Sequence, residues 1–314
     1  MQNLFFKNTK SPLLANNQKE QSVLKISIYS TLILAILGIA FGLSFKSMAI
    51  VFDGIIALIC VGLGLLSLVT SRFIYRSDDD VFQYGYTRFE PIVNLFKSLI
   101  LLIVCIYALL GGIRDILKGG YTLQVDNATI YTICAFILCL GIYLYTKYYA
   151  KRLDSELIKV DSIEWMIDCV LYLGAIVAFS LILLFDPMQE HPLSAYIDPI
   201  LLVSLCVFLS ITPFRVFLSN IKDLMMIAPK DLDDKITEIM EILSTKYGFE
   251  DYDTHVAKSG RFFMIEVNIL ATDSKAKIRV SEIDKIRDEI EEKLNIPSYK
   301  IWLLVSFTTN PKWL

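Results

Sequence analysis

Two carboxylates four residues apart, Glu164 and Asp168, lie in a stretch that is otherwise apolar enough to cross a membrane. At positions i and i+4 of a helix, they share one face. A charged side chain at the bilayer centre costs roughly 2.5–3.5 kcal/mol on insertion scales, and two neighbouring carboxylates also repel each other. The pair therefore needs protons, a bound cation or one shared proton, which makes it a candidate cation site.

The composition of the whole chain is that of a membrane protein. Its 314 residues are 55% hydrophobic, and the mean hydropathy is +0.54. The apolar residues gather in six runs of about 20 residues or more, the length that crosses a bilayer. The runs are Lys25–Ser44, Ser47–Phe73, Glu90–Arg114, Ala128–Lys147, Ser162–Phe185 and Ala195–Leu218. The fold class we expect is a mainly α membrane protein with six transmembrane helices.

The distribution of lysine and arginine predicts the orientation of these spans. One side of the membrane holds most of them, and the other holds only Lys46, Arg114 and Lys118. By the positive-inside rule both termini should be cytoplasmic. The localisation we expect is that of an integral protein of a bacterial inner (plasma) membrane. The first run is too long for a cleavable signal peptide and leads into further spans. A net charge of −3 without a long basic stretch gives no indication of nucleic-acid binding.

Residues 219–314 have the charge and periodicity of a soluble domain. Two amphipathic helices and three strands are expected there, in the order α-β-β-α-β, with a hairpin turn at Ser259-Gly260. Their approximate ranges are 229–247, 252–257, 261–271, 280–294 and 299–307. This order describes a small α+β domain whose helices cover one sheet face. The chain then divides into a cytosolic tail, 1–24, a six-helix domain, 25–218, and a cytosolic domain, 219–314.

The cysteines and histidines limit which side chains could bind a metal within the membrane. All six cysteines lie in apolar segments without a Cys-x-x-Cys pair, so most are expected to be small buried hydrophobes. The two histidines, His191 and His255, lie outside the long apolar runs. A metal site within the membrane must therefore use carboxylates, thiols or the backbone.

Four local motifs, together with the element order, resemble the cation diffusion facilitator (cation efflux) family. The motifs open the second span, precede the third, open the fifth and open the sixth: Ser47–Asp53, Asp78–Glu90, Asp161–Asp168 and Asp198-Pro199. The resemblance covers nearly the whole chain from about Lys25. It implies a homodimeric metal-ion/proton antiporter that exports divalent cations from the cytoplasm, with the cytosolic domain as dimerisation domain.

The resemblance also implies a transport site with two residues from the second span and two from the fifth. The fifth-span pair falls on Glu164 and Asp168, where the family more often has His or Asp first. Counting without gaps places the second-span pair on Ile56 and Cys60, of which only Cys60 can bind metal. Asp53 lies one turn before Ile56, and we expect it to act as the second-span ligand. The alternative is that Asp53 packs locally.

Carboxylate ligands without imidazole suit Mn²⁺, Fe²⁺ or similar ions, and Zn²⁺ remains possible. The transported cation and protons are then the partners of the protein, and no prosthetic group is expected. The family's second metal site uses an Asp and two histidines before the third span, where this chain has Asp79, Phe82 and Tyr86. His255 stands alone in the cytosolic domain, which predicts weak or no metal binding there.

Two function classes remain open on the sequence. One is a proton-coupled exporter of divalent cations. The other is a non-transporting membrane scaffold or sensor, indicated by Ile56 and Cys60 in the second span; the three carboxylates Asp53, Glu164 and Asp168 argue against it. An enzyme is not expected, because the sequence has no nucleophile–base constellation and no Gly-rich phosphate loop.

Overall fold

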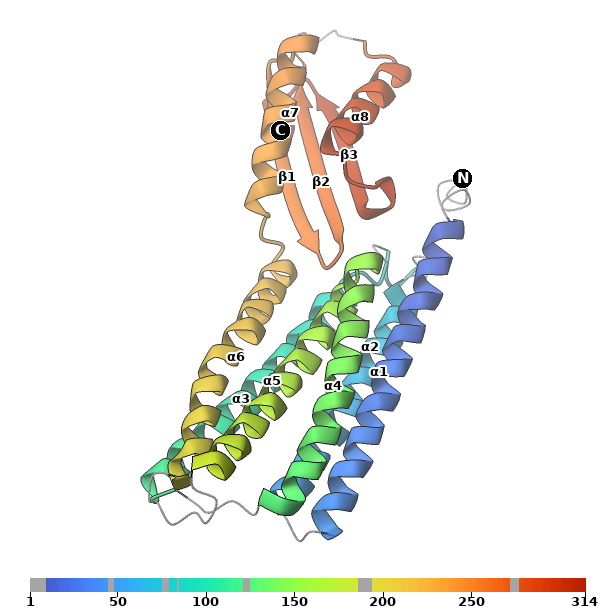
Figure 1. Ribbon diagram of the computed structural model, residues 1–314. Helices are drawn as coiled ribbons and strands as arrows, with labels where there is room; N and C mark the ends of the chain where they lie inside the picture. The colour runs from blue at the N-terminus through green and yellow to red at the C-terminus, as the bar shows by residue number, and fades with distance from the viewer. Residues whose placement is uncertain are drawn as a thin grey trace. The chain divides into compact units, whose positions relative to one another are not determined.

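The computed structural model divides the chain into two compact units, between Asn220 and Ile221. It describes residues 10–44, 48–74, 79–83, 85–120, 125–185, 194–271 and 277–314 (Figure 1). Long helices make up the described part of the first unit: α1 (Lys10–Ser44), α2 (Met48–Ile74), α3 (Phe89–Leu117), α4 (Val125–Leu153), α5 (Glu156–Phe185) and α6 (Ser194–Leu224). Lys46, Ser47, Asp78 and His191, which the sequence analysis singled out, lie outside the described residues.

Among the described residues, five helices are long and apolar enough to cross a membrane. Their apolar stretches are Asn16–Ser44, Asp53–Ile74, Phe89–Leu117, Thr129–Leu153 and Ala195–Leu224. Helix α5 is not one of the five, and its first half carries Asp161, Glu164 and Asp168. The chain is thus an integral membrane protein, while the sixth span stays a prediction. Helix α1 begins at Lys10, well before the predicted start of the first span at Lys25.

Small residues let α1 and α2 approach closely. A Cβ atom on Gly38 would lie 2.9 Å from the Cα atom of Gly54, and one on Gly54 would lie 2.7 Å from the backbone nitrogen of Ile39. One turn further, a Cβ atom on Gly42 would lie 2.5 Å from the backbone nitrogen of Val51. Gly38 and Gly42 therefore serve helix packing, in the manner of small-xxx-small pairs.

The second unit has the element order α7-β1-β2-α8-β3, the order that the sequence predicts (Figure 1). The elements are α7 (Lys230–Tyr247), β1 (Asp251–Ser259), β2 (Phe262–Leu270), α8 (Val280–Leu294) and β3 (Ile301–Thr308). Strand β2 is central, antiparallel to β1 and parallel to β3. Gly260 opens the two-residue β1–β2 loop with φ 59°, a conformation that glycine adopts without steric cost.

The core of this unit lies between one face of the sheet and the two helices. Ile265, Val267 and Ile269 alternate along β2 and are buried together with apolar side chains of both helices in one cluster. Gly248 ends α7 with φ 70°, the left-handed conformation common at helix C-termini. Because apolar side chains alternate along β2, the strand could be predicted from the sequence pattern alone.

Candidate cation site

Helix α5 carries three carboxylates on one face near its start. The side chain of Ser155 accepts a hydrogen bond from the N–H of Ile158 at 3.3 Å and so caps the helix. From there Asp161, Glu164 and Asp168 follow at i, i+3 and i+7, spacings that fall on one side of a helix. The three side chains therefore face the same part of the bundle.

A cavity of about 40 Å³ lies between α2, α3, α5 and α6. This volume is enough for a cation or a few water molecules. Its polar lining comes from Cys60, Cys105, Glu164, Asp168 and Cys206, and apolar residues complete the wall. The structure thus brings together three of the four predicted ligands, from α2 and α5. Cys105 and Cys206 were not predicted, because cysteines in apolar runs look like ordinary core residues.

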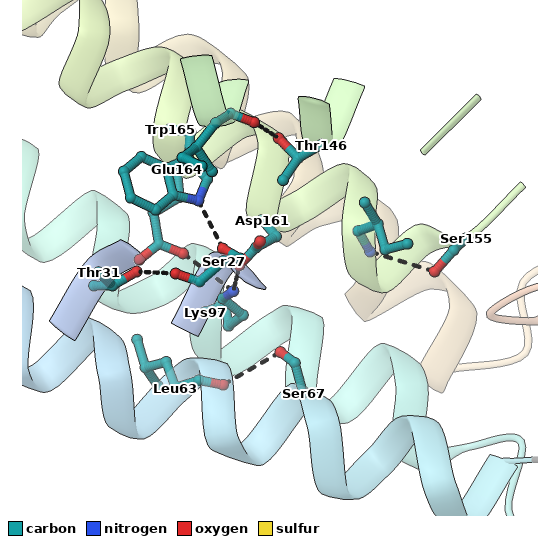
Figure 2. A network of polar contacts seen from close by, with 12 residues as sticks. Ser27, Thr31, Leu63, Ser67, Lys97, Thr146, Ser155, Asp161, Glu164 and Trp165 are labelled. Atoms are coloured by element: carbon teal, nitrogen blue, oxygen red, sulfur yellow. Dashed lines mark hydrogen bonds and ion pairs between the residues drawn. The ribbon is translucent and has the colours of Figure 1, made fainter. Parts of the chain in front are cut away.

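Lys97 of α3 is fully buried and lies between two of the α5 carboxylates (Figure 2). Its Nζ atom is 2.9 Å from Oδ1 of Asp161 and 3.1 Å from Oε2 of Glu164. Sequence reasoning missed this ion pair. The available signal was a single lysine in the middle of the third predicted span, since a buried charge in a membrane almost always pairs with another group.

Asp53 of α2 has different partners. Its Oδ2 atom accepts hydrogen bonds from the hydroxyls of Tyr131 in α4 and Tyr172 in α5, each at 2.5 Å. Asp53 is not part of the cavity lining, whereas Cys60 from the same helix is. These contacts are those of the local-packing alternative, and a role for Asp53 as a ligand stays a prediction.

The remaining predicted ligand, Asp168, is half-buried at the cavity wall. Within the described ranges no hydrogen bond or ion pair joins it to another side chain, in contrast to Asp53 and Glu164. No group of three or more His, Cys, Asp or Glu side chains among the described residues is arranged to hold a metal ion. Asp168 is therefore the predicted ligand in the cavity wall whose carboxylate has no side-chain partner among the described residues.

Helix α5 is also anchored near the site. Nε1 of Trp165 donates a hydrogen bond to Oγ of Ser27 in α1 at 2.7 Å (Figure 2). Both residues are buried, at 3% and 2% exposed. Because Trp165 directly follows Glu164 in the sequence, this contact fixes the rotation of α5 at the point where the ion pair with Lys97 forms.

In the loop before α3, the side chain of Asp79 stabilises the local fold through hydrogen bonds. Oδ1 of Asp79 accepts hydrogen bonds from the N–H groups of Val81 and Phe82, at 3.0 and 2.7 Å. Oδ2 of Asp79 accepts one from the hydroxyl of Tyr86 at 2.5 Å. The tyrosine therefore satisfies the aspartate at a position where the family resemblance implied a histidine. In the second unit, His255 is exposed, and its Nε2 atom lies 3.8 Å from Oδ2 of Asp253.

Comparison with known proteins gives the family of the chain. Residues 24–225 match the family described as cation efflux transmembrane domain. The chain is 25% identical over 289 residues to the uncharacterized transporter YdbO of Bacillus subtilis, covering 89% of this chain and 92% of YdbO. It is 23% identical over 292 residues to the manganese efflux system protein MneS of B. subtilis, covering 88% and 91%. It is 19% identical over 243 residues to the cation-efflux pump FieF of Escherichia coli O139:H28, covering 76% and 75%. The chain belongs to the cation efflux family, the cation diffusion facilitators, which makes it a transporter of metal cations.

Proposed function

We propose that the protein exports divalent metal cations from the cytoplasm in exchange for protons. The observation that carries the proposal is the gathering of Cys60, Glu164 and Asp168 around one small cavity between membrane helices. Carboxylates at such a depth are costly, so they are expected to serve a function. A non-transporting scaffold would gain nothing from them.

The cation that fits best is Mn²⁺ or a similar divalent ion. Oxygen ligands without histidine favour such ions, while the thiol of Cys60 extends the range toward Fe²⁺ and Zn²⁺. The name of MneS, a manganese efflux system protein, supports the same choice. Manganese is therefore the first cation to test, with Fe²⁺ and Zn²⁺ next.

Exchange with protons follows from the chemistry of the ligands. Carboxylates and thiols bind metal in their ionised form, so cation binding releases protons. In an inward-facing conformation Glu164 and Asp168, with Asp53 as the proposed third acid, would capture the cation. In an outward-facing conformation protons would displace it, and alternating access would move the site between the two faces.

The proposed assembly is a homodimer in a bacterial inner membrane, with both termini in the cytoplasm. Residues 1–24 form the N-terminal tail, 25–218 the six-span domain and 219–314 the dimerisation domain. The excess of Lys and Arg on one side of the spans supports this orientation.

Transport by reconstituted protein tests the proposal. Purified full-length protein in proteoliposomes with a lumenal pH dye is offered Mn²⁺, Fe²⁺, Zn²⁺, Co²⁺, Cd²⁺ or Mg²⁺ in turn. We expect uptake of at least one cation, coupled to proton movement in the opposite direction. Absence of cation flux and of proton movement for every ion would reject the transporter and favour the scaffold. Flux without proton movement would reject the antiport mechanism alone.

A further inference from the structure

Glu164 contacts one positive charge, the ammonium of Lys97, and would contact a second if a cation entered the cavity. Its side chain belongs to the cavity lining, and its Oε2 atom is at the same time 3.1 Å from Nζ of Lys97. Lys97 is 0% exposed and cannot turn toward water. A cation that uses Glu164 as a ligand must therefore compete with an ammonium group that is tethered beside it.

Asp161, the second partner of Lys97, can hold the ammonium group after it leaves Glu164. Oδ1 of Asp161 is 2.9 Å from Nζ, while Oδ2 of Asp161 is buried and has no hydrogen-bond partner among the described residues. When Glu164 turns to a cation, the ammonium can contact both oxygens of Asp161. A carboxylate accepts two such contacts readily. The arrangement can therefore exchange partners without leaving Lys97 unpaired.

We propose that Lys97 is a built-in competitor for the transported cation, which holds Glu164 until a divalent ion displaces it and so sets both the affinity and the preference for divalent ions. The proposal rests on the proposed function of the cavity as the transport site. A monovalent ion carries no more charge than the ammonium that it must displace, whereas a divalent ion carries twice as much. Because the ammonium is tethered, its effective concentration at Glu164 is high. Lys97 is thus a specificity-determining residue, with Asp161 as its positioning residue.

A purely structural ion pair would behave differently. If Lys97 only fastened α3 to α5, removing either Lys97 or Asp161 would loosen the same contact and weaken cation binding in both variants. Competition predicts opposite effects. Without Lys97, Glu164 is free to bind the cation, and without Asp161 the ammonium is left to Glu164 alone.

The experiment measures Mn²⁺ binding to purified full-length protein in nanodiscs, from the electron paramagnetic resonance signal of free Mn²⁺. We expect Lys97→Met to lower the Kd for Mn²⁺ by about tenfold or more, as removal of a neighbouring positive charge should. Asp161→Asn should raise the Kd, and Lys97→Arg should keep it near the wild-type value. Added Na⁺ should compete with Mn²⁺ in Lys97→Met and not in the wild type. Lys147→Met removes an exposed ammonium of α4 and should leave the Kd unchanged.

Equal directions of change in Lys97→Met and Asp161→Asn, or an unchanged Kd in Lys97→Met, would overturn the proposal, as would the absence of Mn²⁺ binding throughout. If Lys97→Met does not fold, the double variant Lys97→Met/Asp161→Asn removes one charge of each sign. It should bind Mn²⁺ more tightly than Asp161→Asn alone, and weaker binding would contradict competition. Failure of the proposed function appears separately, as absence of flux in wild-type proteoliposomes.

Discussion

The hydroxyl of Tyr131 lies 2.5 Å from Oδ2 of Asp53, although the two residues are 78 positions apart in the chain. Tyr172 donates to the same oxygen atom, and the two hydroxyls are 3.3 Å apart. One carboxylate oxygen therefore joins α2, α4 and α5. If Asp53 also binds the transported cation, the carboxylate that receives the cation is the one that holds three helices together, so cation binding would be coupled to their relative movement.

Removal of one hydroxyl tests how much this junction stabilises the bundle. Tyr131→Phe should lower the free energy of unfolding by about 1–3 kcal/mol, the usual range for a hydrogen bond to a charged group or for a buried group left unsatisfied. Thermal unfolding of the purified protein in detergent measures the change. Tyr148→Phe is the control, because Tyr148 lies on the same helix and is exposed. An equal shift in both variants would mean that the junction adds no stability.

The role of Asp53 itself is tested by Asp53→Asn. An asparagine oxygen can still accept both tyrosine hydroxyls, so the fold should persist while the negative charge is lost. If Asp53 is a ligand, transport of Mn²⁺ should fall by about tenfold or more, as expected when a charge next to a cation is removed. Uptake at the wild-type rate would show that Asp53 serves packing alone.

Asp168→Ala should abolish transport while leaving the protein folded and the proposed dimer intact. Asp168 lines the cavity and has no side-chain partner among the described residues, so its removal takes away a ligand without breaking an ion pair. Proteoliposome uptake measures transport, and size-exclusion chromatography checks the dimer. The control is Asp115→Ala, which removes a half-buried aspartate near the end of α3 that lies 3.8 Å from Arg114. Wild-type uptake by Asp168→Ala would make the site assignment wrong.

The contact between α1 and α2 should not tolerate even one added methyl group. A Cβ atom on Gly54 would lie 2.7 Å from the backbone nitrogen of Ile39 and 2.9 Å from the carbonyl oxygen of Ala35. Gly54→Ala should therefore lower the free energy of unfolding by about 1–3 kcal/mol, the usual cost of overpacking. Gly62→Ala is the matched control on the same helix, since nothing lies within 4 Å of its added Cβ atom. Similar melting temperatures for the two variants would contradict the close approach.

Local sequence patterns predicted the structural features that depend only on residues close together in the chain. Apolar runs of bilayer length located the five helices that can cross a membrane among the described residues, and the period-2 alternation of Ile265, Val267 and Ile269 located β2. The spacing of Gly38 and Gly42 is likewise a local pattern, one typical of close helix packing. Each of these signals repeats within one element, so one element is enough to recognise it.

Contacts between side chains of different helices could not be predicted, because their signal does not lie within one element. The sequence shows a lysine in the third span and carboxylates in the fifth, but not that Lys97 reaches Asp161 and Glu164. Nor does it show that two tyrosines converge on Asp53. These contacts depend on which helix faces meet across the bundle. A single sequence does not contain that information, and the ligand set read from it therefore included groups that already have partners.

The second unit should respond to pH through an exposed cluster between α7 and α8. Lys246 and Tyr247 each donate a hydrogen bond to Oε1 of Glu289 at 2.7 Å. These bonds, that from Lys246 first, lower the pKa of Glu289 below its ordinary value of 4.5. A lowered pKa in the folded state means that the stabilisation is present above the ordinary value and is lost as pH falls through the folded-state value.

Glu289→Gln should therefore weaken the contact between α7 and α8 at neutral pH and have no effect in acid. Hydrogen–deuterium exchange of the full-length protein should be faster in α8 of the variant at about pH 7 and equal to wild type at a pH below the lowered pKa of Glu289, where the carboxyl is protonated in both the folded and the unfolded state. The difference should be small, because exposed ion pairs contribute little. Glu292→Gln, on the same helix, is the control. A difference that persists at the acidic pH would show that the side chain of Glu289 acts through packing instead of charge.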